Sequence, residues 1–436
     1  MKRLFTFSLC VVLSAVCLGQ SVDTNWVEQY DRVSATHKVE IAIMPDETYL
    51  IAQADQYYNI DINGDSLTSF VENTDFGWVR YMLGTDDGVL LAGTHNNKAA
   101  VAKMDDSFNI EWTTEFPGNS GEAAALLQDG SDIYAAGLTG YNTDFISKLD
   151  TAGDTVWYTE IPQTTFTKLT SIIKLDDGNF LASGNLDDYP LAIKFNSSGD
   201  TLWTYFEYLF ISFTEMSAFE RANGEIVLIG ERVVIELDDD GTKLSDTTYA
   251  RRNFEDIMVD DSYVYLFGSR FEDQYGTDRY PYVEVRDHDM DSISSFKLTD
   301  QIHSTAQNTF HGVVETPNGG MLASGKLRDS VNITGNTYNI LAALFNDTIS
   351  SDTTDTIVGI SYPSVNQMRA FPNPALERTQ LYAVNVLGEI NVYDVNGRLM
   401  KSIFTNERTY SLDITPFEPG MYFVVSDQGV LRLVKP

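Results

Sequence analysis

One short apolar segment that ends in glycine recurs along the chain and constrains its fold more than any other feature. Leu90-Leu91-Ala92-Gly93 has a close copy in Leu181-Ala182-Ser183-Gly184. The copies end at Gly93, Gly137, Gly184, Gly230, Gly268 and Gly325, and Gln53 holds the same place in the first unit. Successive copies lie 38 to 57 residues apart. With turns of Gly, Asp and Asn between the apolar runs, each unit is expected to contain four short strands.

A four-stranded unit of this size cannot bury both of its faces, but units stacked radially can. The repeat therefore predicts an all-β chain with a seven-bladed β-propeller over residues 20–347. Trp157 precedes Gly184 by 27 residues, and Trp26 precedes Gln53 by the same 27. The seventh unit ends near 345–347 without an outer strand. The strand around Trp26 is expected to complete that unit and cover its exposed edge.

Charge excludes two classes of partner. The chain has 436 residues, is 43% hydrophobic and carries a formal net charge of −34. This apolar content is sufficient for a large core and argues against a disordered chain. An acidic protein lacks the cationic surface that grips nucleic acid phosphates, and an anionic membrane surface repels it.

The first residues are typical of an export signal. Lys2 and Arg3 precede an apolar run over 4–18, which is shorter than a membrane span, and small residues stand before Gln20. The sequence predicts a signal peptide at 1–19 and no transmembrane segment in the mature chain. A lipoprotein anchored at Cys17 is the poorer alternative. The other cysteine, Cys10, also lies in the signal, so the mature chain has no disulfide and no thiolate metal site.

The C-terminal segment 370–436 has β-branched and aromatic runs between Asn-Gly and Pro-Gly turns, which predicts a small β-sandwich. Four motifs occur in order within it: Pro372-Asn373-Pro374; Tyr393-Asp394 with Gly397-Arg398; Pro419-Gly420 with Tyr422; and Lys435. This set resembles the type A C-terminal sorting domain of the Bacteroidota type IX secretion system. The resemblance implies cargo of that system, a secreted or cell-surface location reached through the periplasm, and recognition of 370–436 by the secretion machinery. Residues 348–369, rich in Ser, Thr and Asp, are expected to be a linker.

No catalytic or cofactor signature stands out. The Asp61–Asp65 segment imitates a calcium loop, but Ser66 replaces the glycine that such a loop needs, and Asp, Asn and Gly are also what hairpin turns demand. A hairpin is favoured, and calcium is the weaker alternative. The five histidines show no zinc spacing. Trp26, Trp112, Trp157 and Trp203 recur once per unit and are expected to pack rather than to bind sugar. Trp78 falls outside that pattern.

Two long loops suggest where a ligand would bind. The segments 269–282 and 326–338 lie on the face that carries the connections between units, and loops on a rigid scaffold often hold binding residues. Arg and Tyr are common anchors in such sites. The candidate ligand-binding residues are Arg270, Tyr275, Arg279, Tyr280, Tyr282 and Arg328. Local packing of these loops is the favoured interpretation, and a binding site is the alternative.

The favoured function is an exported, non-catalytic binding or interaction module for an extracellular glycan or protein. The alternative is a secreted enzyme that degrades polysaccharide or peptide, since acidic pairs on a propeller face can perform acid–base work. The sequence contains too many carboxylates to nominate such a pair.

Overall fold

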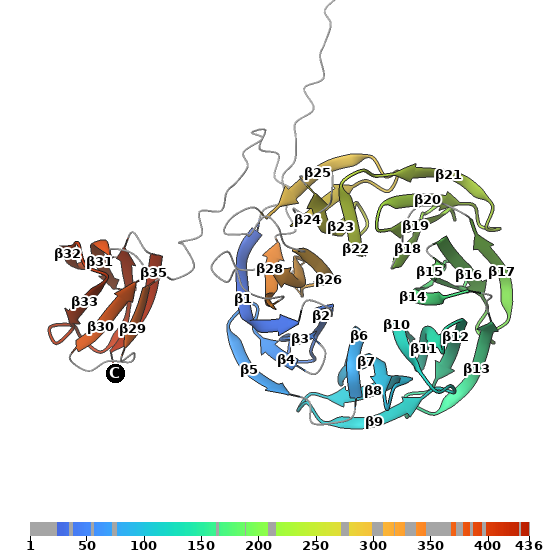
Figure 1. The fold of residues 1–436 in the computed structure, drawn as a ribbon, viewed down its shortest axis with the longest axis horizontal. Helices are drawn as coiled ribbons and strands as arrows, with labels where there is room; N and C mark the ends of the chain where they lie inside the picture. The colour runs from blue at the N-terminus through green and yellow to red at the C-terminus, as the bar shows by residue number, and fades with distance from the viewer. Residues whose placement is uncertain are drawn as a thin grey trace, which may run out of the picture. The chain divides into compact units, whose positions relative to one another are not determined.

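The computed structural model describes residues 24–34, 38–53, 56–71, 76–162, 165–187, 189–207, 215–271, 279–298, 308–317, 319–327, 337–345, 368–371, 378–383, 387–394, 398–426 and 429–435. The predicted signal peptide, and the predicted linker up to residue 367, lie outside these residues. The chain divides into two compact units, Met1–Asp355 and Thr356–Pro436. All described elements in both units are β-strands (Figure 1).

The described strands of the first unit form four-stranded antiparallel sheets. In chain order, the sheets are β2 (Glu40–Ile43), β3 (Tyr49–Gln53), β4 (Gln56–Ile60) and β5 (Ser66–Val71); β6 (Phe76–Thr85), β7 (Gly88–His95), β8 (Lys98–Asp105) and β9 (Ile110–Glu115); β10 (Gly121–Asp129), β11 (Asp132–Thr139), β12 (Thr143–Leu149) and β13 (Thr155–Pro162); β14 (Thr167–Lys174), β15 (Phe180–Leu186), β16 (Tyr189–Phe195) and β17 (Thr201–Phe206); β18 (Met216–Glu220), β19 (Ile226–Gly230), β20 (Val233–Leu237) and β21 (Lys243–Thr248); β22 (Arg252–Val259), β23 (Val264–Phe271), β24 (Arg279–Arg286) and β25 (Ser292–Lys297); and β26 (Thr309–Glu315), β27 (Met321–Leu327), β28 (Thr337–Phe345) and β1 (Thr24–Ser34).

The first strand of each sheet faces the centre of the unit, and the fourth lies at the periphery (Figure 1). Each inner strand lies next to the inner strand of the following sheet, and β26 lies next to both β22 and β2. Apolar clusters fill the space between neighbouring sheets; Ile51 of β3 and Leu322 of β27, for example, share one such cluster. The expected all-β class and its four-stranded repeat are therefore confirmed.

The N-terminal strand occupies the place predicted for it. β1 pairs antiparallel with β28, with Trp26 opposite Leu344 and Val33 opposite Tyr338. It is the fourth strand of a sheet whose other three strands come from residues 309–345. The paired residues of these two strands thus lie more than 300 positions apart in the chain.

In five of the sheets, a β-bulge in the inner strand lies opposite the repeat glycine. In the sheet of β10 and β11, a β-bulge falls between Ala123 and Ala125, opposite Gly137. A Cβ added to Gly137 would stand 2.1 Å from the carbonyl oxygen of Glu122, so no other residue fits without moving the backbone. An added Cβ would stand equally close to an inner-strand carbonyl oxygen at four other repeat glycines. The distances are 2.2 Å at Gly93, 2.0 Å at Gly184, 1.9 Å at Gly268 and 2.2 Å at Gly325. The β2–β3 pairing, where Gln53 replaces the glycine, has no bulge, and the β18–β19 pairing, which keeps Gly230, has none either.

The repeated tryptophans join neighbouring sheets. Trp157 of β13 donates its indole N–H to the carbonyl of Ser197 in the next sheet at 3.0 Å, and its ring covers Gly199. Trp203 repeats the arrangement with Asp239 and Gly241. A side chain at these turn glycines would collide with the indole. The packing role predicted for the outer-strand tryptophans is confirmed for Trp112, Trp157 and Trp203; the side chain of Trp26 lies outside the described residues.

The second unit contains a three-stranded sheet, β29 (Met368–Phe371), β30 (Arg378–Ala383) and β33 (Thr409–Asp413), and a four-stranded sheet in the order β32 (Leu399–Thr405), β31 (Gly388–Asp394), β34 (Gly420–Ser426) and β35 (Gly429–Lys435). Leu381 and Leu412 from the first sheet share one buried cluster with Ile390, Val424 and Leu433 from the second. The two sheets therefore have a common apolar core.

Candidate functional site

A polar cavity of about 400 Å³ lies among the inner strands of the first unit. Its charged and polar lining includes Lys38, Glu40, Arg80, Lys168, Thr170, Glu215, Glu255, Asp256 and His311. Four of these side chains stand at the inner-strand bulges, because the register shifts leave Arg80, Thr170, Glu255 and His311 outside the regular pairing. Bulges commonly redirect side chains in this way. The repeat glycines, which lie on the second strand opposite these bulges, thus help to position the side chains that line the cavity.

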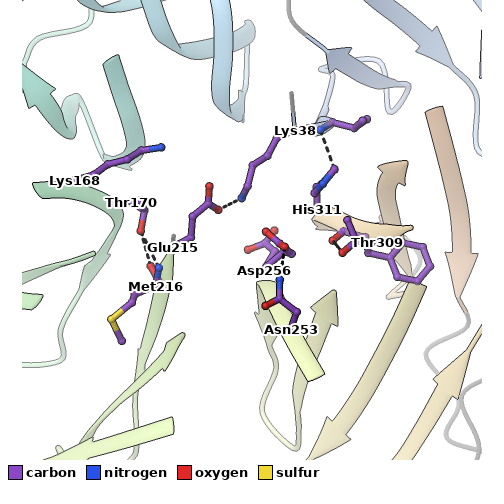
Figure 2. A network of polar contacts seen from close by, with 12 residues as sticks. Lys38, Lys168, Thr170, Glu215, Met216, Asn253, Asp256, Thr309 and His311 are labelled. Atoms are coloured by element: carbon purple, nitrogen blue, oxygen red, sulfur yellow. Dashed lines mark hydrogen bonds and ion pairs between the residues drawn. The ribbon is translucent and has the colours of Figure 1, made fainter. Parts of the chain in front are cut away.

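Lys38 and Glu215 form an ion pair inside the cavity. Figure 2 shows the Lys38 ammonium extending to the Glu215 carboxylate, and the two residues precede inner strands β2 and β18. Both side chains are mostly buried. The Thr170 hydroxyl donates to the carbonyl of Met216 at 3.0 Å, which joins β14 to β18 on the same side of the cavity.

Three charged side chains from consecutive inner strands form a second network. Glu122 of β10 accepts hydrogen bonds from Arg80 Nε of β6 at 2.6 Å and from Lys168 Nζ of β14 at 2.7 Å. Burial would raise the pKa of Glu122, but Lys168 and Arg80 outweigh it and hold that pKa below its ordinary value. Burial lowers the pKa of Lys168 despite its contact with Glu122. Glu122 therefore stays ionised between two cations.

Two carboxyl groups on the other side of the cavity are poised near neutral pH. Burial raises the pKa of Glu40 to about 7 and that of Asp256 to about 6. Asp256 accepts backbone N–H groups from Ile257 at 2.8 Å and Val313 at 3.0 Å. Glu40 is 5% exposed, and its Oε1 has no hydrogen-bond partner among the described residues. A buried polar atom without a partner costs stability, so the Glu40 carboxyl is a candidate for binding something that enters the cavity.

His311 is neutral in this setting. Its Nδ1 accepts the backbone N–H of Val39 at 3.1 Å, which leaves the ring proton on Nε2 (Figure 2). Burial, reinforced by Lys326 and Lys38, lowers the pKa of His311 well below its usual value. Burial also raises the pKa of the neighbouring bulge residue Glu255. The imidazole can therefore donate one hydrogen bond but carries no charge.

The predicted ligand-binding residues on β23 and β24 are partly engaged with one another. Tyr282 is buried, and its hydroxyl donates to Glu284 at 3.2 Å, while Arg270 lies 5.7 Å from its ring centroid. Arg279 packs over the ring of Phe271 at 4.7 Å, and Lys297 packs over Tyr280 at 5.1 Å. Tyr275 and Arg328 lie outside the described residues.

The predicted ligand-binding residues Arg270, Arg279, Tyr280 and Tyr282 do not line the cavity. The charge of Arg279 acts on two groups, since it favours the ionised form of Glu255 and lowers the pKa of Lys326, although burial is the larger influence on both. The sequence analysis missed Lys38, Glu40, Arg80, Glu122 and Lys168. The sequence marks the place of Arg80 only by spacing, because each bulge residue precedes its repeat glycine by 13 or 14 positions. The other four residues have no such signal.

The Asp61 turn is a hairpin turn. The Asp61 carboxylate accepts the backbone N–H groups of Asn63 at 2.8 Å and Asp65 at 2.9 Å, as Asx turns do. Within the described ranges, no three His, Cys, Asp or Glu side chains are grouped to hold a metal ion. The described residues also contain no helix long and apolar enough to cross a membrane.

The motif residues of the second unit organise its turns. The Lys435 ammonium donates to the backbone carbonyls of Ile414, Thr415 and Phe417. The Tyr422 hydroxyl donates to the carbonyl of Glu418 at 2.6 Å, which ties down the segment before Pro419-Gly420. The Arg398 backbone N–H donates to the Asp394 carboxylate at 2.9 Å. Tyr393 lies in β31 and Gly420 begins β34, whereas Pro372, Asn373, Pro374 and Gly397 lie outside the described residues.

Four-stranded sheets that direct polar side chains into an axial cavity define a propeller-like class of protein. Known structures are similar in fold to the chain. A structure of streptogramin B lyase is 14% identical, with a TM-score of 0.52 over 74% of this chain and 98% of that one. A chain from a structure of the mitotic checkpoint complex is 10% identical, with a TM-score of 0.51 over 78% of this chain and 98% of that one. At these identities the likeness concerns the fold alone.

The C-terminal segment has a match of a different kind. Residues 369–435 match the family described as the secretion system C-terminal sorting domain. This match confirms the predicted resemblance to cargo of type IX secretion, and it implies a secreted or cell-surface location and an interaction with the secretion machinery. A search of curated proteins gives no significant match.

Proposed function

We propose that the chain is an exported, seven-bladed β-propeller, closed by β1 and followed by a β-sandwich sorting domain, that binds an extracellular ligand in its axial cavity without catalysing a reaction. The pairing of β1 with β28 and the adjacency of β26 to β2 support the closed ring. The common core of the two C-terminal sheets supports the sandwich. No cofactor is needed for this function, and calcium at the Asp61 turn stays the weaker prediction.

The Glu40 carboxyl carries the proposal. It is buried, lines the cavity and has an oxygen without a hydrogen-bond partner among the described residues. Lys38 and Asp256 act on its charge from the neighbouring wall. A bound polar ligand would supply the missing hydrogen bond to Glu40. Little conformational entropy would be lost, because rigid inner strands already hold the surrounding groups. The predicted ligand-binding residue Arg279 does not line the cavity, and its place in the site stays a prediction.

Binding is tested on the chain from residue 20 to residue 436 with saccharide, peptide and small-amine arrays. Calorimetry on the best-bound compound follows. Glu40→Gln keeps the size of the side chain but replaces its carboxyl group with an amide that cannot ionise. We expect this variant to bind about tenfold more weakly. Glu111→Gln, on the exposed side of β9, is the matched control and should bind normally. Equal affinity of the wild type and Glu40→Gln, or an absence of binding to all three arrays, would contradict the proposal.

A second candidate function has its own support. Glu40 and Asp256, with pKa values of about 7 and about 6, could act as general acid or base at neutral pH beside His311. This is the arrangement that a polysaccharide- or peptide-degrading enzyme would use. Turnover of any array polymer that is abolished by Asp256→Asn would favour the enzyme over the binding module.

Export is tested by intact mass. We expect the chain in the culture medium or at the cell surface to begin near Gln20 and to lack most of residues 370–436. A surface form that retains the whole C-terminal segment would contradict the processing step, but it would leave the sorting function in place.

A further inference from the structure

Trp78 contacts Arg80, a residue that lines the cavity. It belongs to the inner strand β6, whereas Trp112, Trp157 and Trp203 belong to outer strands. Its side chain is 51% exposed. The guanidinium carbon of Arg80 lies 5.7 Å from the centroid of its ring. Because Arg80 lines the cavity, this contact places the half-exposed Trp78 side chain next to the charged network.

The Arg80, Glu122 and Lys168 network presents donors and an acceptor in a fixed arrangement. Arg80 uses Nε on Glu122, and within the described part of the chain its two Nη groups make no hydrogen bond. Glu122 is ionised and accepts from both cations, so it holds their orientation. Arg80 itself stands at a bulge that Gly93 permits, so its backbone is fixed as well. Little further ordering is needed before this set can bind a ligand.

We propose that the ligand of this site is a carbohydrate, with Trp78 stacking against one sugar ring and the Arg80–Glu122–Lys168 network binding the adjacent hydroxyl groups. The inference rests on the proposed binding function and names its ligand class. An exposed tryptophan alone would not assign a ligand, since single apolar side chains are common on surfaces. Here the indole and the charged groups adjoin one another.

The chemistry of the site fits a sugar better than other polymers. A pyranose ring offers an apolar face of C–H groups, which packs on an indole, and an edge of hydroxyls, each able to donate and accept. The network carries two positive charges and one negative charge, and a neutral ligand suffers no repulsion there. A strongly acidic chain disfavours nucleic acids and polyanionic surfaces. Peptides remain the main competitors, and the experiment separates them.

The test uses the chain from residue 20 to residue 436 on an array of neutral, amino and uronic-acid oligosaccharides, with a peptide array in parallel. Calorimetry on the best-bound oligosaccharide then compares variants. Trp78→Ala should weaken binding about tenfold or more, and Trp78→Tyr should recover much of it, because a smaller aromatic face remains. Leu202→Ala, which truncates an equally exposed side chain on outer strand β17, should bind as the wild type does.

A second measurement covers the case in which Trp78→Ala fails to fold. Oxidative footprinting of the wild type, read by mass spectrometry, should show Trp78 protected when the oligosaccharide is bound. Saccharide binding that leaves Trp78 unprotected, or affinity that is unchanged in Trp78→Ala, would overturn the inference. Binding of peptides alone, weakened by Glu40→Gln, would overturn the carbohydrate assignment and leave the proposed function standing. Binding that depends on neither residue would overturn both.

Discussion

Replacing the repeat glycine Gly137 with alanine should destabilise the protein by a route that the structure makes explicit. A Cβ at this position would stand 2.1 Å from the Glu122 carbonyl oxygen and 2.8 Å from the Ala123 Cα. Both are backbone atoms in the inner strand, which is held by its neighbours and cannot yield cheaply. Overpacking of this kind costs about 3 kcal/mol. The same displacement would move Glu122 away from Arg80 and Lys168.

Gly130 is the matched control because it lies in the turn between the same two strands. Its φ is +63°, and nothing lies within 4 Å of an added Cβ. Gly130→Ala therefore introduces only the strain of a left-handed backbone, about 1 kcal/mol. Urea unfolding followed by tryptophan fluorescence gives both free energies if the slopes agree. The reasoning is refuted if Gly130→Ala costs as much as Gly137→Ala, or more.

Three further predictions concern other parts of the chain. The pKa of Glu40 rises from 4.5 to about 7 on folding. The protonated carboxyl therefore contributes fully to the free energy of unfolding below pH 4.5, and about 3 kcal/mol of it is lost as the pH rises through about 7. Burial also raises the pKa of Asp144 to about 7 and that of Asp256 to about 6, so Glu40→Gln should reduce the fall in urea midpoint between pH 5 and pH 8 without abolishing it. An unchanged fall would show that Glu40 does not contribute to it. Lys435→Met deletes donors to three backbone carbonyls and should destabilise the C-terminal unit by about 2 kcal/mol. Limited proteolysis of residues 369–435 should reveal this, and resistance equal to the wild type would argue against the role of Lys435. Deleting residues 20–30 removes most of β1, exposes the edge of β28 and should cause aggregation, whereas a monomer in light scattering that melts like the parent would contradict it.

The fold could be predicted from the sequence to a greater extent than the candidate site. The spacing of Gly93 and its later copies predicted four-stranded units, and the matching distance from Trp26 to Gln53 predicted which strand β1 would join. These inferences succeeded because strands and turns leave periodic local signals. The candidate loop residues were chosen from local density of Arg and Tyr, which does not distinguish a packed Tyr282 from a ligand-binding residue.

Repetition also concealed the site. Arg80, Thr170, Glu255 and His311 occupy equivalent bulges but share no residue type, so no motif connects them in the sequence. The repeat itself is conspicuous because its glycines and tryptophans solve the same packing problem in each unit. The residues that give the cavity its chemistry differ between units.

The amino-acid sequence by itself determined the repeat, the place of β1 and the C-terminal sorting motifs, because each depends on contacts between near neighbours or on a fixed spacing. Only the tertiary structure brought Lys38 to Glu215, and only it placed Arg80, Glu122 and Lys168 in one network. These groups come from different sheets, and they meet because the sheets surround a common axis. The raised pKa of Glu40 has the same origin, since burial in that shared cavity, and not the local sequence, sets the cost of its charge.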